Sequence, residues 1–344
     1  MESMIFSKNI LNPWRILIWV ISIIIFCLVG FLIYMFTGQV EQAPKVAFGV
    51  TFSQTFAEDM SLDWQKTYLA MLDDLRVRKL RLVAYWPRIE PNQGNYSFED
   101  LDWQIKEAGR RDAEVILVIG RKVPRWPECH IPDWAKNLSE SKQQERILLL
   151  LTEIVKHYSG NETIKAWQVE NEPFLSGFGV CPKFDKQFLD KEIALVRQLN
   201  FEQRPIVVTA SGELSSWLKP ARRADIFGTT LYRIVWIEKI GHFKYPIPAV
   251  FYYKRAKLVK WLTDVKKMII IELQAEPWSP SSINETAVWK QAKSMDLDKF
   301  KGIIDYAQRT GFEEAYLWGV EWWYWKKEHG NNALWQEAKK LWTD

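Results

Sequence analysis

Short apolar runs alternate with amphipathic stretches from residue 45 to the end of the chain. Each run has the length of a buried β-strand, and each amphipathic stretch has the apolar spacing of a helix that covers a sheet with one face. The predicted strands are residues 46–51, 80–85, 114–120, 165–170, 205–210, 225–231, 267–273 and 314–320. The predicted helices are residues 62–77, 98–110, 143–158, 184–199, a short and weak one at 214–219, 249–263, 297–310 and 332–342.

Eight strand–helix units over about 300 residues match the size and alternation of a (β/α)8 TIM barrel. The alternative is a doubly wound open sheet. No Gly-rich phosphate loop follows the first predicted strand, and eight units suit closure into a barrel. No internal boundary divides this region, so residues 45–344 are predicted to form one domain.

The stretch from residue 16 to residue 36 contains no charged side chain, and its 21 positions suffice to cross a bilayer core of ~30 Å as a helix. Lys8 and Arg15 precede it, whereas Glu41 and Lys45 follow it. This excess of positive charge before the helix favours a cytoplasmic N-terminus and an extracytoplasmic chain after it. A cleaved signal peptide is the rival interpretation, but the stretch is long for one and no small-x-small site ends it.

The predicted organisation is therefore a single-pass membrane protein with an uncleaved signal anchor. Its parts are a short cytoplasmic tail (1–15), the transmembrane helix (16–36), a linker (37–44) and an extracytoplasmic barrel (45–344).

Composition narrows the function further. The formal charge of +4 is small for 344 residues, and no Lys/Arg block forms a nucleic-acid stripe, so no nucleic-acid partner is expected. Nineteen Trp and twelve Tyr are a heavy aromatic load. Most of these rings should pack in the core, and the excess also suits the flat walls of a cleft that binds sugar rings.

Two carboxylic acids stand where predicted strands end. Asn171, Glu172 and Pro173 follow the fourth strand, and Glu272 ends the seventh. In a barrel, residues at the carboxyl ends of the strands surround one mouth, where the active site lies. A pair of carboxyl groups is what a retaining glycosidase needs, one as acid and one as nucleophile, roughly 5–5.5 Å apart.

The motifs around these acids resemble clan A, the large clan of retaining (β/α)8 glycoside hydrolases that includes families 1, 5, 39 and 42. Asn-Glu-Pro at the end of the fourth strand resembles the acid/base signature of that clan, and Ile-Glu-Leu-Gln around Glu272 resembles its nucleophile strand. The second strand, Arg81-Leu-Val-Ala-Tyr-Trp86-Pro-Arg-Ile-Glu-Pro91, resembles the pattern Arg-x4-Trp-x-Arg-Ile-x-Pro. The sixth strand carries Asp-x-x-Gly-x-x-x-Tyr, which ends at Tyr232, and the eighth carries Tyr-Leu-Trp-Gly around Trp318.

The resemblance implies a role for each of these residues. Glu172 would act first as acid and then as base, and Glu272 would be the nucleophile. Asn171 would bind the 2-hydroxyl of the sugar, and Arg81 would contact the nucleophile and hold it ionised. Tyr232 would donate a hydrogen bond to the nucleophile.

Trp318 would be the aromatic platform under the sugar in the cleavage subsite. Glu276 competes with Glu272 as the nucleophile because Ala-Glu-Pro repeats the context of Asn-Glu-Pro, but it lies four residues farther on, in the loop beyond the strand. Trp86 belongs to the second-strand motif. Trp323 follows the eighth strand and is expected to belong to the cleft wall or to the packing around it.

The loop after the third strand departs from the pattern of those families. Arg121 or His130 in this loop would bind a sugar hydroxyl or an acidic substituent, or else serve in ion pairs that hold the loop. Cys129 and Cys181 could form one disulfide outside the cytoplasm or remain free thiols, since Cys27 lies in the membrane segment. No Cys/His spacing indicates a zinc site, and the mechanism requires neither a metal nor a cofactor.

The sequence thus predicts a membrane-anchored retaining glycoside hydrolase that cleaves O-glycosidic bonds, of β configuration, in an extracytoplasmic poly- or oligosaccharide by double displacement. Two alternatives use the same barrel: a glycan-binding protein without catalysis, and a transglycosylase in which a sugar replaces water as the acceptor.

Overall fold

The computed structural model describes residues 13–40, 45–279 and 281–343. Most of the predicted cytoplasmic tail, including Lys8, and half of the predicted linker, including Glu41, lie outside the described residues.

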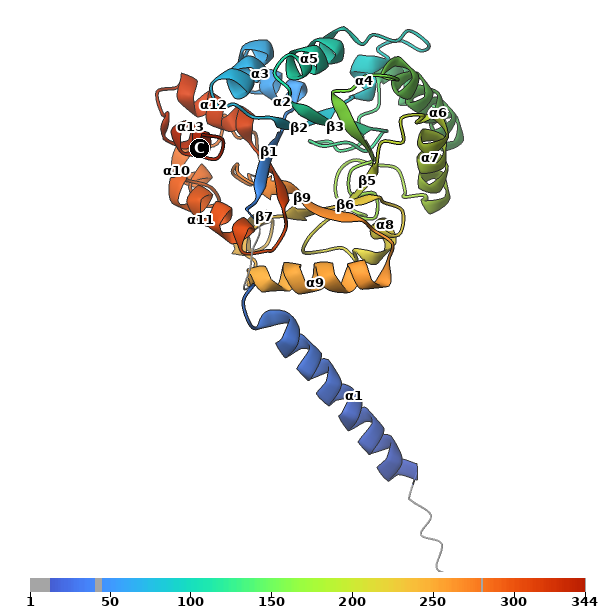
Figure 1. The fold of residues 1–344 in the computed structure, drawn as a ribbon, viewed down its shortest axis with the longest axis vertical. Helices are drawn as coiled ribbons and strands as arrows, with labels where there is room; N and C mark the ends of the chain where they lie inside the picture. Colours follow the sequence, from blue (N-terminus) through green and yellow to red (C-terminus); the bar gives the residue numbers. More distant parts are fainter. Residues whose placement is uncertain (1–12, 41–44, 280, 344) are drawn as a thin grey trace, which may run out of the picture.

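Eight parallel strands close into a barrel, as the alternation along the chain predicts (Figure 1). Around the barrel each strand pairs with its neighbour in the order β1-β10-β9-β6-β5-β4-β3-β2. The strands are β1 (Ala47–Thr51), β2 (Lys79–Val83), β3 (Glu114–Ile119), β4 (Ile164–Val169), β5 (Ile206–Ala210), β6 (Ile226–Leu231), β9 (Lys267–Gln274) and β10 (Glu314–Trp318). Helices cover the outer face of the barrel, so the strands are buried on both faces and are apolar nearly throughout.

Seven helices lie where the amphipathic stretches predict them, and an eighth, α8 (Leu218–Ala221), overlaps the weak predicted helix at 214–219 only at residues 218 and 219. The seven are α3 (Trp64–Asp73), α5 (Glu99–Gly109), α6 (Glu140–His157), α7 (Lys186–Leu199), α9 (Ala249–Leu262), α11 (Leu297–Gln308) and α13 (Ala333–Lys339). Polar side chains at Asp63, Ser139, Asp185 and Asp296 accept hydrogen bonds from the first free backbone N–H groups of α3, α6, α7 and α11, which fixes where these helices begin.

The structure adds short elements at the strand ends that the sequence pattern does not reveal. They are α2 (Gln54–Asp59), α4 (Trp86–Ile89), the 3-10 turn η1 (Asp133–Ala135), the antiparallel pair β7 (Ile234–Ile237) and β8 (Gly241–Lys244), α10 (Val288–Gln291) and α12 (Val320–Glu328). These insertions surround the carboxyl ends of the strands.

The two largest apolar clusters hold the barrel together. The larger lies between the strands and the helices, and the smaller is built from alternate side chains of the strands, among them Ile116, Val207, Ile271 and Tyr316. Position 49 in β1 must be a glycine, because a Cβ atom there would lie 2.7 Å from the ring of Tyr316 in this smaller cluster.

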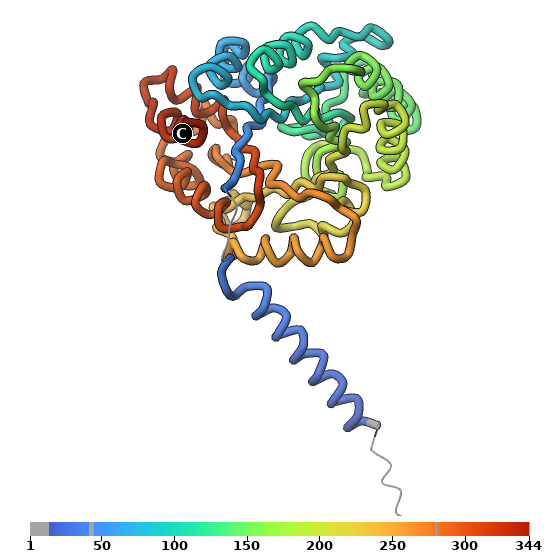
Figure 2. Tube along the Cα trace, in the orientation of Figure 1, coloured from blue at the N-terminus to red at the C-terminus, as the bar shows by residue number. Residues whose placement is uncertain are grey.

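Helix α1 (Pro13–Phe36) projects away from the barrel as a separate rod (Figures 1 and 2). Its segment from Trp14 to Phe36 contains an 18-residue stretch with a mean hydropathy of 3.2 and is long and apolar enough to cross a membrane. At its carboxyl end, the ring of Phe36 lies 5.0 Å from that of Phe251 on α9, and Lys254 donates a hydrogen bond of 2.8 Å to the carbonyl of Thr37. The end of the apolar helix is therefore fixed against one side of the barrel.

Candidate active site

Arg81 on β2 connects its own strand to the ends of β4 and β9, which lie elsewhere around the barrel. Its side chain is fully buried, and it donates hydrogen bonds to Gln168 Oε1 at 2.8 Å, Glu272 Oε1 at 2.8 Å and Asn171 Oδ1 at 2.7 Å. These three acceptors come from β4, from β9 and from the loop that follows β4. The guanidinium group therefore holds the Glu272 carboxylate and the Asn171 amide in fixed positions at the same mouth.

The carboxylate of Glu272 receives a donor on each oxygen. Arg81 binds Oε1, and the hydroxyl of Tyr232, just after β6, donates to Oε2 at 3.0 Å. Burial, and next the charge of Glu272, raise the pKa of Tyr232 well above its usual range, so the phenol keeps the proton that it donates. The carboxylate of Glu272 is therefore held in one orientation by a guanidinium group and a phenol.

Glu172 lies in surroundings that favour the protonated form of its carboxyl group. Its backbone N–H donates to Thr209 Oγ1 at 2.8 Å, and its carboxyl oxygen accepts a hydrogen bond from Thr230 Oγ1 at 3.4 Å. Lys122 lies nearby, but its ammonium donates to the backbone carbonyls of Glu172 and Leu175. Burial raises the pKa of Glu172 well above its usual range, with further contributions from the charges of Glu272 and Glu128. The side chain therefore holds a proton under conditions in which a solvated glutamic acid has lost it.

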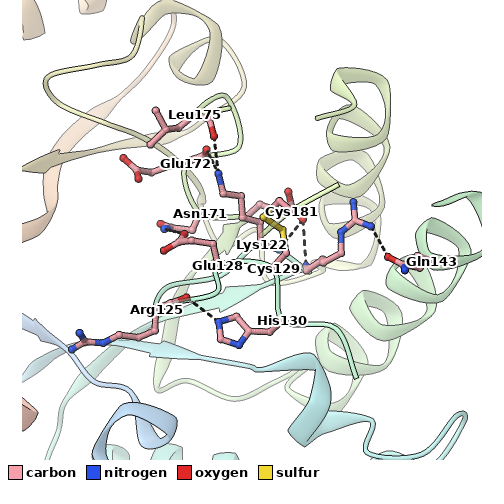
Figure 3. The surroundings of a disulfide bond; sticks show 12 residues. Lys122, Arg125, Glu128, Cys129, His130, Gln143, Asn171, Glu172, Leu175 and Cys181 are labelled. Carbon is pink, nitrogen blue, oxygen red and sulfur yellow. Dashed lines mark hydrogen bonds between the residues drawn. A yellow bond between two sulfur atoms is a disulfide. The ribbon is translucent and has the colours of Figure 1, made fainter. Parts of the chain in front are cut away.

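The loop between β3 and η1 brings two more charged groups to the mouth, Arg125 and Glu128. The residues expected from the sequence in this loop were Arg121 and His130 instead. Both new residues have left-handed backbone conformations, with φ of 82° and 72°. A disulfide between Cys129 and Cys181 ties this loop to the loop after β4, with an S–S distance of 2.03 Å (Figure 3).

Glu128 lies next to Asn171 at the mouth of the barrel. Its Oε2 accepts a hydrogen bond from Asn171 Nδ2 at 3.2 Å. Burial, and next the negative charge of Glu272, raise the pKa of Glu128 to about 8. The mouth therefore holds a third buried carboxyl group beside the pair found in the sequence.

The guanidinium group of Arg125 lies over the ring of Trp318. The guanidinium carbon is 4.1 Å from the centroid of the Trp318 ring, and Nη2 lies 3.0 Å from Glu321 Oε2. Arg125 also pairs with Glu276, which in turn accepts a hydrogen bond of 2.8 Å from Trp318 Nε1. Glu276 thus belongs to a buried ion cluster, whereas Glu272 contacts Arg81.

Trp86 and Trp323 are fully buried rather than part of a cleft wall. Trp86 Nε1 donates to Glu90 Oε2 at 2.8 Å, and Trp323 Nε1 donates to the carbonyl of Ala275 at 2.7 Å. The suggestion that Trp323 lines the cleft is wrong, because α12 turns its side chain into the core. Both indoles are packed in the core next to the ends of the strands.

The side chains of Arg121 and His130 make contacts that hold the loop after β3 in place. Arg121 is paired with Glu140 at the start of α6, on the outer side of the barrel. His130 Nε2 lies 3.0 Å from the carbonyl of Arg125, and burial lowers the pKa of the His130 ring. The expectation of ion pairs that hold the loop therefore describes Arg121, and His130 braces the backbone that presents Arg125.

Glu213, in the segment after β5, is another residue that the sequence analysis missed. It accepts hydrogen bonds from the backbone N–H of Tyr232 at 3.0 Å and from the hydroxyl of Tyr252 at 2.6 Å, and burial raises its pKa to about 7. The rule that selects polar residues just beyond each strand would have found it.

Comparison with known proteins supports the architecture. No protein-family model matches the chain. A curated relative, the β-galactosidase BgaA of Clostridium cellulovorans, is 25% identical over 178 residues, which is 45% of this chain and 26% of that protein. The chain therefore spans about a quarter of the length of this relative.

Several solved structures share the fold. GH5_18 from Bifidobacterium longum subsp. longum matches with a TM-score of 0.59 at 13% identity, over 80% of this chain and 69% of that chain. The exo-β-1,4-mannosidase Op5Man5 from Opitutaceae bacterium strain TAV5 matches with a TM-score of 0.56 at 14% identity, over 82% and 53%. The β-galactosidase from Rahnella sp. R3 matches with a TM-score of 0.56 at 12% identity, over 88% and 56%. By its closed parallel barrel and these similarities, the chain is a (β/α)8 barrel of the kind found in glycoside hydrolases.

Proposed function

We propose that the protein is a retaining glycoside hydrolase that cleaves β-glycosidic bonds of an extracytoplasmic poly- or oligosaccharide. The observation that carries the proposal is that the two carboxyl groups lie in different surroundings. Glu272 is held by Arg81 and Tyr232, whereas burial raises the pKa of Glu172. A general acid must keep its proton while its partner acts as the nucleophile, and the different surroundings of Glu172 and Glu272 support this division of roles.

The reaction would proceed in two displacements. In the first, Glu272 attacks the anomeric carbon while Glu172 gives its proton to the glycosidic oxygen, so the carbon–oxygen bond breaks and a glycosyl ester forms on Glu272. In the second, the ionised Glu172 takes a proton from water, and the resulting hydroxide attacks the anomeric carbon and breaks the ester bond. Glu172 is then protonated again, Glu272 is free, and the anomeric configuration is retained.

The neighbouring residues would bind the sugar and hold the acids. Asn171, oriented by Arg81, would contact the substituent on carbon 2 of the sugar. Trp318 would form a wall of the cleavage subsite, with Arg125 across one face of its ring. The same intermediate would allow transglycosylation if a sugar, rather than water, reached the anomeric carbon.

Residues 16–36 would anchor the protein in a membrane, with residues 1–15 cytoplasmic, a linker at residues 37–44 and the barrel of residues 45–344 outside the cytoplasm. The Lys and Arg residues before the apolar segment support this orientation. The disulfide between Cys129 and Cys181 supports it too, because such bonds persist in oxidising compartments.

The direct test is hydrolysis by the full chain in detergent solution, with a panel of aryl β-glycosides and β-linked polysaccharides. The anomer of the first product is recorded by proton NMR before mutarotation. We expect the β anomer to form first. An α anomer as the first product would refute the retaining mechanism, and glycan binding without turnover across the panel would favour a binding protein on a barrel scaffold.

A further inference from the structure

Glu128 gives the mouth of the barrel a carboxyl group that the two-displacement reaction does not use. Its side chain is buried and reaches Asn171 Nδ2 at 3.2 Å. In Figure 3 the side chains of Glu128, Asn171 and Glu172 all extend to the same side, away from the disulfide. A sugar that contacts Asn171 at the point of cleavage would therefore also meet Glu128.

The cations near this position are already engaged. Arg81 is committed to Glu272, Arg125 to Glu276 and Glu321, and Lys122 to two backbone carbonyls. Within residues 45–279 and 281–343, no Lys, Arg or His forms an ion pair with Glu128. A buried carboxyl group without a cation is unfavourable as an anion, and burial accordingly raises the pKa of Glu128.

The hydrogen-bond directions restrict what the sugar can present. The Nδ2 group of Asn171 donates to Glu128, and its Oδ1 accepts from Arg81. The group that a ligand meets beside Asn171 is thus the carboxyl of Glu128, which only accepts hydrogen bonds once it has lost its proton. A donor that carries positive charge fits this position best, because it also neutralises the buried carboxylate.

We propose that Glu128 selects a sugar with a free amino group on carbon 2 in the subsite where the bond is cleaved. This inference rests on the proposed function, since the position of carbon 2 follows from the role given to Asn171. The ammonium group on carbon 2 would lie beside Asn171 and donate to the neighbouring Glu128 carboxylate. The substrate class is then a β-linked glycan of 2-amino-2-deoxy sugars with free amino groups.

Binding tests the inference separately from catalysis. The full chain in detergent carries Glu172→Gln to prevent turnover, and calorimetry compares a tetramer of β-1,4-linked glucosamine with cellotetraose, which differs from it only in the carbon-2 substituent. We expect the amino tetramer to bind roughly ten- to a hundredfold more tightly, as for a hydrogen bond to a charged group. Adding Glu128→Gln, which keeps the shape and the contact with Asn171, should abolish this preference.

The matched control is Glu114→Gln, added to the Glu172→Gln protein. Glu114 begins β3, the strand that precedes the loop of Glu128, and lies at the opposite end of the barrel, where it pairs with Lys79. Its replacement should leave the preference unchanged. Equal affinity of the two tetramers would overturn the inference, and so would a preference that survives Glu128→Gln. Thermal unfolding of each variant shows that the comparison is made on folded protein.

Hydrolysis then distinguishes the two proposals. If the wild type cleaves aryl β-glucosides but its Glu172→Gln form binds both tetramers equally, the inference fails and the proposed function stands. If no glycoside is cleaved while the amino tetramer binds through Glu128, the proposed function fails and the role of Glu128 stands. If both stand, kcat/KM for the aryl β-glucosaminide should exceed that for the β-glucoside, and Glu128→Gln should remove the difference.

Discussion

Replacing Arg81 by methionine tests how the mouth of the barrel is held together. The Arg81→Met substitution removes the cation that binds Glu272 Oε1 at 2.8 Å and leaves a buried carboxylate without its partner. The side chains of Arg81 and Glu272 are 0% and 5% exposed, so little solvent is available to replace the lost interaction. The hydrogen bonds to Gln168 and Asn171 are lost as well.

The expected cost follows from this burial. Breaking one partner of a buried ion pair costs about 3–5 kcal/mol of the free energy of unfolding, whereas an exposed pair contributes about 0.2–1 kcal/mol. We therefore expect Arg81→Met to lower the stability by about 3–5 kcal/mol. Hydrolysis should be lost too, because the Glu272 carboxylate and the Asn171 amide are no longer oriented.

Urea unfolding of the full chain in detergent, followed by tryptophan fluorescence, measures the loss from the shift of the midpoint at an unchanged m-value. Arg309→Met is the matched control, because Arg309 pairs with Asp305 at the surface, where the two side chains are 61% and 63% exposed. The double variant Arg81→Met with Glu272→Gln removes both charges and should unfold at a higher urea concentration than Arg81→Met alone. An Arg81→Met midpoint equal to that of Arg309→Met would refute the reasoning.

Three further predictions concern the same mouth. Tyr232→Phe removes the 3.0 Å hydrogen bond to Glu272 Oε2, so kcat should fall roughly tenfold or more, as for a hydrogen bond to a charged group; an unchanged kcat would show that this bond plays no part. Because burial and the charge of Glu272 raise the pKa of Glu172 well above 4.5, kcat/KM should persist to neutral pH and decline only as the pH rises through the raised pKa; a decline already complete near pH 5 would contradict this assignment. Cys129→Ser with Cys181→Ser opens a crosslink between residues 52 positions apart, and urea unfolding should show a loss of about 2–4 kcal/mol; an unaltered midpoint would mean that the crosslink does not stabilise the fold.

Much of the barrel follows from the sequence because buried strands and amphipathic helices leave different patterns. The β4 and β9 strands are mostly apolar runs, and a polar residue that ends such a run must lie at the mouth of a parallel barrel. This rule, with the resemblance to clan A, is enough to select Glu172, Glu272 and Arg81. The structure brings these residues to the same mouth and joins Arg81 to Glu272 directly.

The loops do not follow from the sequence in the same way. Strand alternation tells which face a side chain occupies, but Arg125 and Glu128 lie in a loop where left-handed backbone conformations decide their direction. The sequence left two roles open for Arg121, sugar binding or an ion pair that holds the loop, and Arg121 pairs with Glu140. Helix α12 escaped prediction for another reason: its side chains are buried on most sides, so no amphipathic period marks it.

The most direct test of the reaction is to remove the nucleophile and supply a substitute. Hydrolysis of an activated aryl β-glycoside by the full-length Glu272→Ala variant is measured with and without sodium azide, and the product is identified by NMR. Glu276→Ala serves as the comparison, because Glu276 lies only four residues farther along the chain and is engaged with Arg125. We predict that Glu272→Ala abolishes hydrolysis and that azide partly restores turnover with an α-glycosyl azide as product; full activity of Glu272→Ala, or rescue by azide in Glu276→Ala instead, would contradict the assignment of Glu272.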